Sequence, residues 1–455
     1  MQRVRGLAVA VAMTSVAVTA CAGEAGTATA TTTAATRSQA AAPAPEIPAT
    51  KVGDRLRWVL DAVNRTPIAE SELNEHFAAA FLQQVTAARL NEIFKSLQGM
   101  KLDKLTDVQP TALAGDVTVA GQKLVLTISV DTSGKIDGLV FRPPQTPRPT
   151  PASWNELGER LRKTAPKVTF LAAEVTKDSK CRPVYSVSPN EARPLGSMFK
   201  LYVLGAVAER IDDGDFRWNT QLTIKPELRS PSGTLYDKPD GSKVTVQEAA
   251  NLMISISDNT GTDLLIHKAG RAKTEEIDRE WSKNAKRNVP FLTTREMLVM
   301  KAIDYPKHAK RYLSFNTKNQ KLAYLKNTVA KLPVDKVTLW PKPRDIETIE
   351  WFGSANDMCR AHAELRKLTD KNVGQAMSIN DGGLALDAKQ WPSVWFKGGS
   401  EPGVVDLGYS ARTADGKTYF VTVMASNPTE VFDDAEIANE LLSLTRGAFT
   451  LMVQS

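Results

Sequence analysis

The spacing of hydrophobic residues divides the chain into regions of different periodicity. Between residues 51 and 97, apolar side chains recur every three or four positions, as in DRLRWVLDAVN and in the longer stretch that starts at ESELNEH. This spacing is typical of amphipathic helices. The period then changes, because QKLVLTISV and IDGLVFRP, separated by the turn sequence DTSGK, have the pattern of a β-hairpin. We therefore expect a small α+β domain over residues 51–142.

The order of elements in this first domain, with helices before a curved sheet, is similar to the cone-shaped fold of the ketosteroid-isomerase and nuclear-transport-factor kind. The similarity concerns the fold alone and assigns no chemistry, because one fold hosts many functions. The proline-rich stretch PPQTPRPTP, residues 143–151, follows and predicts a linker at a domain boundary.

A second series of helices and strands fills residues 152–455. WNELGERLRKTA predicts a helix, residues 168–189 predict two strands around a turn, and another helix begins near Ser197. A long, mostly helical middle follows. Strands return in SVWFKGGS and in residues 403–426, and a last helix closes the chain. Strands on both sides of a helical block predict an α+β domain, with an antiparallel sheet assembled from both chain ends and helices on both faces.

The N-terminal residues are typical of an exported protein. Two arginines precede an apolar run from Leu7 to Ala20, which is too short for a good membrane span and has the build of a secretory signal. The run ends in VTAC, which resembles a bacterial lipobox, in which Cys21 becomes the lipidated first residue of the mature chain. The alternative is an ordinary cleavage site followed by an incidental cysteine. We expect a signal and lipobox over residues 1–21 and a lipid anchor on Cys21 at the outer face of the cytoplasmic membrane.

The residues after the signal fit the same location. Residues 22–50 are rich in Ala, Thr and Pro and contain almost no large apolar side chain, so they predict a flexible tether. Two further cysteines, Cys181 and Cys359, would lie in an oxidising compartment, where they could form a disulfide or remain two buried thiols. The sequence leaves both possibilities open.

The net charge of +7 does not indicate nucleic-acid binding. The chain has no long Lys/Arg run and no basic stretch interleaved with aromatic residues, so we interpret the excess as a solvated surface suited to an anionic envelope. The four histidines show no metal-ligand spacing. We therefore expect no nucleic-acid partner, no metal ion and no cofactor.

Candidate chemistry begins with the stretch RPLGSMFKLYVLGAV. Ser197 and Lys200 are three positions apart, so they share a face of the predicted helix. Both could be surface decoration. They could also be a nucleophile and its base, because a free hydroxyl is a poor nucleophile at neutral pH and needs one. Lys200 could be that base if burial and the helix N-terminus lower the pKa of its ammonium group.

Two further motifs follow in the order and spacing of serine acyl-transfer enzymes. S-D-N occurs at residues 257–259, just after the predicted helix TVQEAANLMISI. K-[ST]-G occurs in altered form as KGGS, residues 397–400, on a predicted C-terminal strand. S-x-x-K alone is expected by chance roughly once or twice in a chain of this length. Three motifs in the proper order and context are far more specific.

The three motifs, together with SGTLYDKPDGSKVTVQEAANLMISISDNTGTDLLI, resemble class A β-lactamases and low-molecular-weight penicillin-binding proteins. The resemblance extends over about residues 155–452. The two-domain build and the stretch NVPFLTTREMLVMKA are similar to the β-lactamase-like protein of clavulanic acid biosynthesis and to related actinobacterial lipoproteins. The family resemblance implies a β-lactamase/transpeptidase-like fold and a small-molecule substrate that is a β-lactam, an ester or a cell-wall peptide.

The resemblance implies four catalytic residues. Ser197 would attack the substrate and form an acyl-enzyme, with Lys200 as its base. Lys397, a second cation, would lower the pKa of Lys200 further. Ser257 would relay a proton between one of these lysines and the leaving group.

It also implies three substrate-binding residues, Asn259, Gly399 and Ser400. Asn259 would hold a substrate amide or position Lys200. The backbone N–H groups of Ser197 and Ser400 would form an oxyanion hole, in which each donor is typically worth about 3–4 kcal/mol in the transition state.

Two departures from the family pattern affect substrate and turnover. Class A β-lactamases carry an E-x-x-L-N glutamate that activates the deacylating water, whereas residues 279–294 contain only Glu280, with no Leu-Asn after it. Gly398 stands where the family has Ser or Thr, so the hydroxyl that binds the substrate carboxylate is missing. Ser400 could partly replace this hydroxyl, and Arg412 could supply a charge.

The leading hypothesis is therefore an exported, lipid-anchored serine hydrolase with weak β-lactamase or esterase activity. A D,D-peptidase of the cell wall is the first alternative, because such peptidases also lack the glutamate. The second alternative is a degenerate, non-catalytic lipoprotein that binds the envelope.

Overall fold

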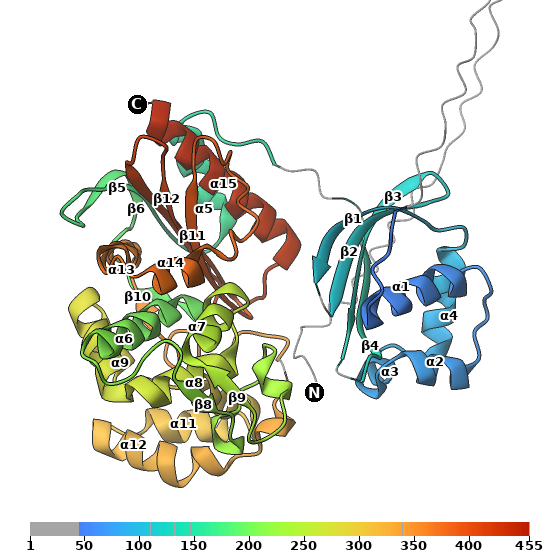
Figure 1. The fold of residues 1–455 in the computed structure, drawn as a ribbon, viewed down its shortest axis with the longest axis horizontal. Coiled ribbons are helices and arrows are strands. Elements are labelled where there is room, and N and C mark those ends of the chain that lie inside the picture. The colour runs from blue at the N-terminus through green and yellow to red at the C-terminus, as the bar shows by residue number, and fades with distance from the viewer. Residues whose placement is uncertain are drawn as a thin grey trace, which may run out of the picture. The chain divides into compact units, whose positions relative to one another are not determined.

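The computed structural model describes residues 45–454, except for residues 110, 132, 143, 145–147 and 339. The chain forms two compact units, residues 1–145 and 146–455 (Figure 1). The predicted signal and lipobox, with Cys21, and the predicted tether as far as residue 44 lie outside the described residues. Within the described part of the chain, no helix is long and apolar enough to cross a membrane.

The first unit packs short helices against one antiparallel sheet (Figure 1). The strands pair in chain order, and the buried core lies between the helices and the sheet, with Leu56 of the first helix and Ile128 of the third strand among its members. This arrangement confirms the predicted α+β class. The elements are α1 Lys51–Ala62, α2 Glu70–His76, α3 Ala79–Gln84, α4 Ala87–Ser96, β1 Lys101–Gln109, β2 Ala112–Val119, β3 Gln122–Val130 and β4 Ile136–Arg142.

The sheet of this unit is larger than the sequence predicts. The pattern predicts one hairpin, β3 and β4, but β1 and β2 precede it. The pairing of β1 with β2 shifts register after Leu102 and again after Leu105. Each shift interrupts the alternation of apolar and polar side chains, which is the signal by which a strand is recognised in a sequence.

The predicted helical stretch of the first unit is also interrupted. Phe77 leaves the helical path and forms an isolated bridge with Ile136 on β4, and the N–H of Ala78 donates to the carbonyl oxygen of Ile136 at 2.8 Å. The stretch therefore forms α2, α3 and α4 instead of one long helix. A periodic apolar pattern predicts helix but does not locate such a break.

The second unit is built around a five-stranded antiparallel sheet assembled from both ends of the unit, as predicted. The strand order is β11-β12-β13-β5-β6, so a strand from near the C-terminus pairs with a strand from the start of the unit. This places β11 at one edge of the sheet. The strands are β5 Lys167–Val175, β6 Cys181–Val187, β11 Ser393–Glu401, β12 Val404–Arg412 and β13 Thr418–Ser426.

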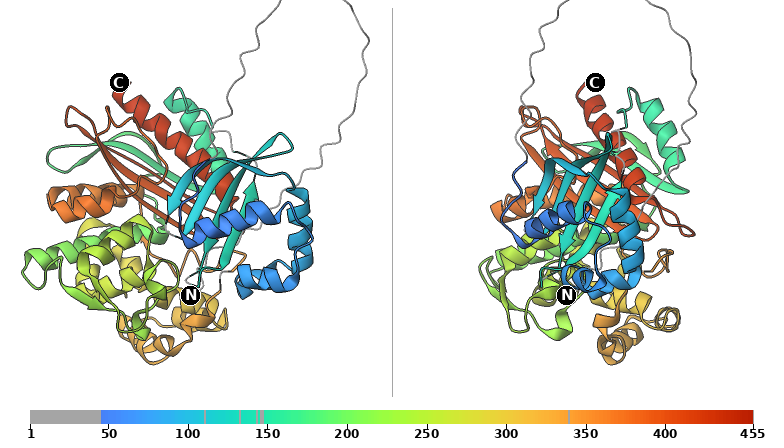
Figure 2. Two further views of the ribbon diagram at one scale, coloured as in Figure 1. Left: turned by 45° about the vertical axis from the view of Figure 1, so that its right-hand side comes forward. Right: turned by 90° about the vertical axis from the view of Figure 1, so that its right-hand side faces the viewer.

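Helices cover both faces of this sheet, which confirms the predicted class (Figures 1 and 2). Alternate strand residues point to opposite sides. Leu171 and Phe420 join the core on one face, whereas Phe170 and Val421 pack with α5 (Trp154–Thr164) and α15 (Asp434–Gln454) on the other. The helices on the first face are α6 Lys200–Asp212, α7 Val246–Ser255, α8 Asn259–Ala269, α9 Arg271–Trp281, α10 Thr294–Ala302, α11 Lys307–Leu313, α12 Lys318–Asn327, α13 Ala355–Lys367 and α14 Lys371–Ser378.

Short strands join the loops around these helices. β7 (Arg193–Pro194) pairs with β10 (Phe352–Gly353), and β8 (Gln221–Thr223) pairs with β9 (Lys243–Thr245). The first of these pairs lies immediately before Ser197 and is antiparallel, so the segment that precedes Phe352 and the segment that carries the serine are held side by side.

A disulfide connects the sheet to its helical cover. Cys181 on β6 is bonded to Cys359 on α13, with 6.3 Å between their Cα atoms and 178 positions between them in the sequence. Of the two possibilities that the sequence leaves open, the structure contains the bridge.

We predict that removing this bridge destabilises the second unit without changing its fold. Replacing both Cys181 and Cys359 by Ala should lower the free energy of unfolding by about 2–5 kcal/mol, because the bridge restricts the unfolded chain. Urea unfolding with and without a reductant measures the effect. Reductant should lower the stability of the wild-type chain and leave the double variant unchanged, and equal stability of both proteins under oxidising conditions would contradict the prediction.

Candidate active site

Ser197 lies in a single turn of 3₁₀ helix, η1 (Gly196–Phe199), which leads directly into α6. The two residues between Ser197 and Lys200, Met198 and Phe199, are buried in the core and fix the turn in place. Ser197 remains partly exposed, whereas Lys200 is fully buried. The S-x-x-K spacing thus leaves the hydroxyl within reach of a ligand and encloses the amine.

The amine of Lys200 binds the second motif. Its Nζ donates to the carbonyl oxygen of Ser257 at 2.8 Å, to the Oγ of Ser257 at 3.0 Å and to the Oδ1 of Asn259 at 2.7 Å. The hydroxyl of Ser257 can both donate and accept, unlike the other two partners, which only accept. A proton can therefore pass between Lys200 and Ser257.

Ser257 is held in an uncommon backbone conformation between two helices. Its φ is +61°, in the left-handed region that few residues other than glycine adopt. The N–H of the next residue, Asp258, donates to the carbonyl oxygen of Leu252 on α7 at 3.0 Å, and Asp258 caps α8 through the N–H of Gly261. These contacts on both sides maintain the conformation, which points the hydroxyl toward two lysines. Such strain is found where a site needs one particular geometry.

Lys397, on β11, is the second of these lysines. It is 2% exposed, and its Nζ lies 3.2 Å from the Oγ of Ser257 and 2.7 Å from the carbonyl oxygen of Gly398. Burial lowers the pKa of Lys397 well below its usual range, and the nearby Lys200 lowers it further. Burial also lowers the pKa of Lys200, to about 7, although Asp258 and Asp263 oppose that shift. Two buried ammonium groups around one hydroxyl repel each other, so one amine is uncharged at neutral pH.

Two glycines allow β11 to approach the serine turn. A Cβ atom on Gly196 would lie 2.7 Å from the backbone nitrogen of Ser400. A Cβ atom on Gly399 would lie 2.8 Å from the backbone nitrogen of Ser197 and 2.1 Å from the carbonyl oxygen of Leu195. The backbone N–H groups of Ser197 and Ser400 are therefore brought together, as an oxyanion hole requires. Gly399 is required here for the close approach of two backbones.

Asn259 has both of its amide atoms engaged within the protein. Its Oδ1 accepts from Lys200, and its Nδ2 donates to the carbonyl oxygen of Pro231 at 2.7 Å. Of the two roles that the sequence suggests, these contacts correspond to positioning Lys200.

The sequence model of the beta-lactamase enzyme family matches residues 154–379, which contain the serine turn and the S-D-N segment. Residues 154–379 are therefore similar in sequence to this family. We refer to the second unit, residues 146–455, as the β-lactamase-like unit. A separate family model, described as the N-terminal part of the ORF 12 gene product, matches residues 47–136. No curated protein matches the chain.

Several solved structures are similar to this chain over the β-lactamase-like unit. PBP-A is 18% identical, with 68% of this chain and 100% of that chain covered and a TM-score of 0.45. A PBP-A mutant, described as an acyl-enzyme complex with penicillin G, is 17% identical, with 69% and 100% covered and a TM-score of 0.45. The beta-lactamase from Sphaerobacter thermophilus is 17% identical, with 67% and 98% covered and a TM-score of 0.46.

Three charged residues near the departures from the family pattern lie apart from the two lysines, whereas Gly398 directly follows Lys397 and accepts a hydrogen bond from its amine. Glu280 is exposed near the end of α9. Glu296 caps α10 and is paired with Arg271 at 2.7 Å. Arg412 is exposed and pairs with Ser393 at the opposite end of β11 from Ser400. None of these three side chains has a described contact with Ser197.

Two buried acids complete the site, and sequence reasoning did not assign them a role. Asp258 accepts the N–H of Leu235. A Cβ atom on Gly233 would lie 2.3 Å from the carboxyl carbon of Asp258, so the loop that contains Gly233 packs directly against Asp258. Asp263 accepts the N–H groups of Thr294 and Arg295, and burial raises its pKa to about 6. The sequence signal for these two acids is the presence of polar residues in the segment SDNTGTDLLI. The same pattern also fits a capped helix.

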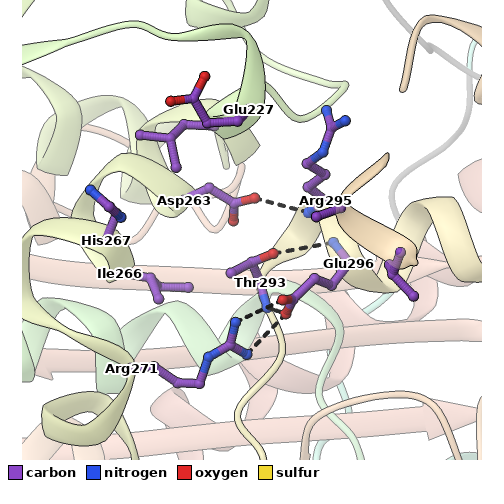
Figure 3. A pocket seen from close by; sticks show the side chains of 11 residues that line it. Glu227, Asp263, Ile266, His267, Arg271, Thr293, Arg295 and Glu296 are labelled. Atoms are coloured by element: carbon purple, nitrogen blue, oxygen red, sulfur yellow. Dashed lines mark hydrogen bonds and ion pairs between the residues drawn. The ribbon is translucent and has the colours of Figure 1, made fainter. Parts of the chain in front are cut away.

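A cavity of about 260 Å³ is lined in part by Asp263 (Figure 3). In Figure 3, Asp263 receives the backbone N–H of Arg295, and Arg271 faces Glu296. The lining residues are Glu227, Leu228, Asp263, Ile266, His267, Arg271, Thr293, Arg295, Glu296, Val329 and Ala330. The four predicted catalytic residues are absent from this wall, so the cavity is distinct from the serine site.

The pKa of Lys200 predicts the pH dependence of serine acylation. Below pH 7 the buried amine is protonated and cannot accept a proton, so the rate should rise about tenfold per pH unit until the pH reaches about 7. This rise can be measured as the rate of covalent labelling by an acylating probe, followed by intact mass between pH 5 and 9. Lys200→Arg is the matched control, since a guanidinium stays charged throughout. A flat profile in the wild type would contradict the prediction.

Proposed function

We propose that this protein is an exported, lipid-anchored serine hydrolase that works through an acyl-enzyme on Ser197. The observation that carries the proposal is the chain of contacts from Lys200 through the hydroxyl of Ser257 to Lys397, next to two converging backbone N–H groups. The match of residues 154–379 to the beta-lactamase family model supports the same acyl-enzyme mechanism.

Acylation follows from these positions. Uncharged Lys200 takes the proton of the Ser197 hydroxyl as its Oγ attacks the acyl carbon, and the N–H groups of Ser197 and Ser400 stabilise the developing oxyanion. When the tetrahedral adduct collapses, the hydroxyl of Ser257 gives its proton to the leaving nitrogen or oxygen. Ser257 then recovers a proton from the ammonium of Lys200, which returns to its uncharged form.

Deacylation has weaker support than acylation. Water must attack the acyl group on Ser197, and this step needs a base to accept its proton. Glu280 is exposed, and Glu296 is held by Arg271. We therefore propose that β-lactams acylate the enzyme and are released slowly, so that β-lactamase activity is weak. Esters, whose alkoxide leaving groups depart more easily than amines, should acylate Ser197 faster than amides, although their acyl-enzymes need the same attack by water.

A D,D-peptidase activity is the second candidate, since cell-wall peptides react through the same acyl-enzyme. The structure gives less support to a non-catalytic envelope-binding protein. A structural lysine gains nothing from full burial beside a second buried lysine, whereas a catalytic base does. Release of D-alanine from a stem peptide would favour the peptidase, and turnover of short-chain aryl esters without it would favour the esterase.

The acyl-enzyme predicts a covalent adduct that depends on one hydroxyl. The wild-type chain incubated with a chromogenic cephalosporin should gain the mass of the opened β-lactam, and the adduct should persist longer than the time needed to form it. Ser197→Ala should remove the adduct, whereas Ser378→Ala, which removes an exposed hydroxyl on α14, should keep it. An adduct that survives in Ser197→Ala would overturn the proposed function.

The anchor is tested separately, because Cys21 lies outside the described residues. Cell fractionation should place the wild-type chain in the membrane fraction and Cys21→Ser in the soluble or unprocessed pool, since two or more acyl chains give stable attachment. Cys181→Ser, which breaks the disulfide with Cys359, is the control for loss of a cysteine elsewhere in the chain and should stay with the membrane. Equal distribution of Cys21→Ser and wild type would contradict the anchor and leave the hydrolase proposal unaffected.

A further inference from the structure

Three charged side chains meet inside the β-lactamase-like unit at the end of β11. Lys301 on α10 has no exposed surface, and its Nζ donates to both carboxyl oxygens of Glu401, at 2.7 and 2.9 Å. Glu401 is the last residue of β11 and directly follows Ser400. Glu350, 4% exposed, lies within hydrogen-bonding reach of Glu401.

This cluster contains two carboxyl groups and one ammonium group. The Oε2 of Glu350 accepts the N–H of Trp351 at 2.6 Å, and its Oε1 has no hydrogen-bond donor in the described part of the chain. A proton between the two carboxyl groups would satisfy this oxygen and leave a neutral cluster. Burial raises the pKa of Glu350 well above its usual range, and the charge of Glu401 raises it further while Lys301 opposes the shift. The geometry and the burial thus agree on one shared proton.

Other charged groups near the cluster do not replace that proton. The guanidinium of Arg344 donates to the carbonyl oxygen of Lys301 at 2.6 Å and lies over the rings of Tyr305 and Trp340. Its charge is directed at the backbone of α10 and at two aromatic faces. The carboxyl pair is therefore balanced chiefly by Lys301.

The cluster connects the two backbone segments that carry the oxyanion donors. On one side, Glu401 continues from Ser400. On the other side, Trp351 follows Glu350, its carbonyl oxygen accepts the N–H of Leu195 at 2.8 Å, and its ring stacks on Phe199 with centroids 3.6 Å apart. Leu195 and Phe199 bracket the serine turn.

We propose that Glu350, Glu401 and Lys301 form a positioning site for the oxyanion hole, effective while the carboxyl pair holds one proton. The inference rests on the proposed function and adds residues to it. Loss of the proton places a second buried negative charge on Glu350, beside the charged Glu401 that directly follows Ser400. That charge both repels the developing oxyanion and separates the two carboxyl groups that hold the segments together.

Two variants of the full chain test the two parts of the proposal. Glu401→Gln removes the charged link to Lys301 and should slow acylation by a chromogenic cephalosporin at saturating concentration about 10–100-fold at pH 7, with little change in the concentration for half-maximal rate. Glu350→Gln keeps the shape and stays uncharged. It should acylate at about the wild-type rate at pH 7 and keep that rate at alkaline pH, where the wild-type rate falls.

Stability supplies a readout that does not depend on activity. The raised pKa of Glu350 means that the folded chain binds a proton more tightly than the unfolded chain, so the wild type loses stability as pH rises above about 4.5. Glu350→Gln has no such group. Its melting temperature relative to wild type should increase from pH 5 toward alkaline pH.

Glu440→Gln is the matched control. Glu440 is also a buried carboxylate with a cationic partner, Arg160 at 2.8 Å, but it lies on α15 on the other face of the sheet. This variant should keep the wild-type acylation rate and its pH profile. The positioning role would be overturned if Glu401→Gln were acylated at the wild-type rate, or if the acylation rates of Glu350→Gln and wild type had identical pH profiles. Absence of any adduct in the wild type would instead overturn the proposed function.

Discussion

The site depends on the burial of two lysine side chains around one serine hydroxyl. Water would keep Lys200 and Lys397 charged, and charged amines cannot accept a proton from Ser197. Removal from water lowers both pKa values, and mutual repulsion means that both cannot stay charged. The uncharged amine that the proposed mechanism needs is thus produced by its surroundings rather than by its residue type, and the neighbouring elements contribute to enclosing it.

The sheet topology explains how these surroundings are assembled from distant parts of the chain. Ser197 and Lys200 follow the strands of the N-terminal end of the unit, Ser257 lies between two helices of the middle, and Lys397 lies on an edge strand near the C-terminus. Pairing of β13 with β5 joins the two chain ends into one sheet. An edge strand has one free side, so β11 can offer a backbone donor to a ligand without breaking the sheet.

Much of this arrangement could be anticipated from the sequence, for physical reasons. S-x-x-K, S-D-N and KGGS are local patterns of reactive residue types, and the hydrophobic pattern predicted helices next to the first two motifs and a strand for the third. The sheet assembled from both ends follows from strands flanking a helical block. In the first unit, by contrast, β1 and β2 were not predicted, because register shifts hide the alternation of apolar residues.

What the sequence could not show are the pairings between residues far apart in the chain. Nothing in a glutamate at position 350 indicates that it meets Glu401 and Lys301, since each is an ordinary charged residue in its local context. The hydrogen bond from the Asn259 amide to the carbonyl oxygen of Pro231 was equally hidden. Holding a substrate amide and positioning Lys200 both require an asparagine, so the residue type does not distinguish the two roles. Contacts of this kind depend on the folded backbone and carry no local signature.

The energetic cost of the site is itself an argument about function. Ser257 holds a left-handed φ, and two lysines and the acids Asp258 and Asp263 are buried beside it. Apolar residues of similar size would stabilise such a position as well or better, because desolvation of charge offsets much of the gain from pairing. The rest of the unit offsets this cost with two hydrophobic cores on opposite faces of the sheet and a disulfide between β6 and α13. A fold that only presented a surface to the envelope would have no need of an uncharged amine, so the burial of Lys200 is best explained by proton transfer.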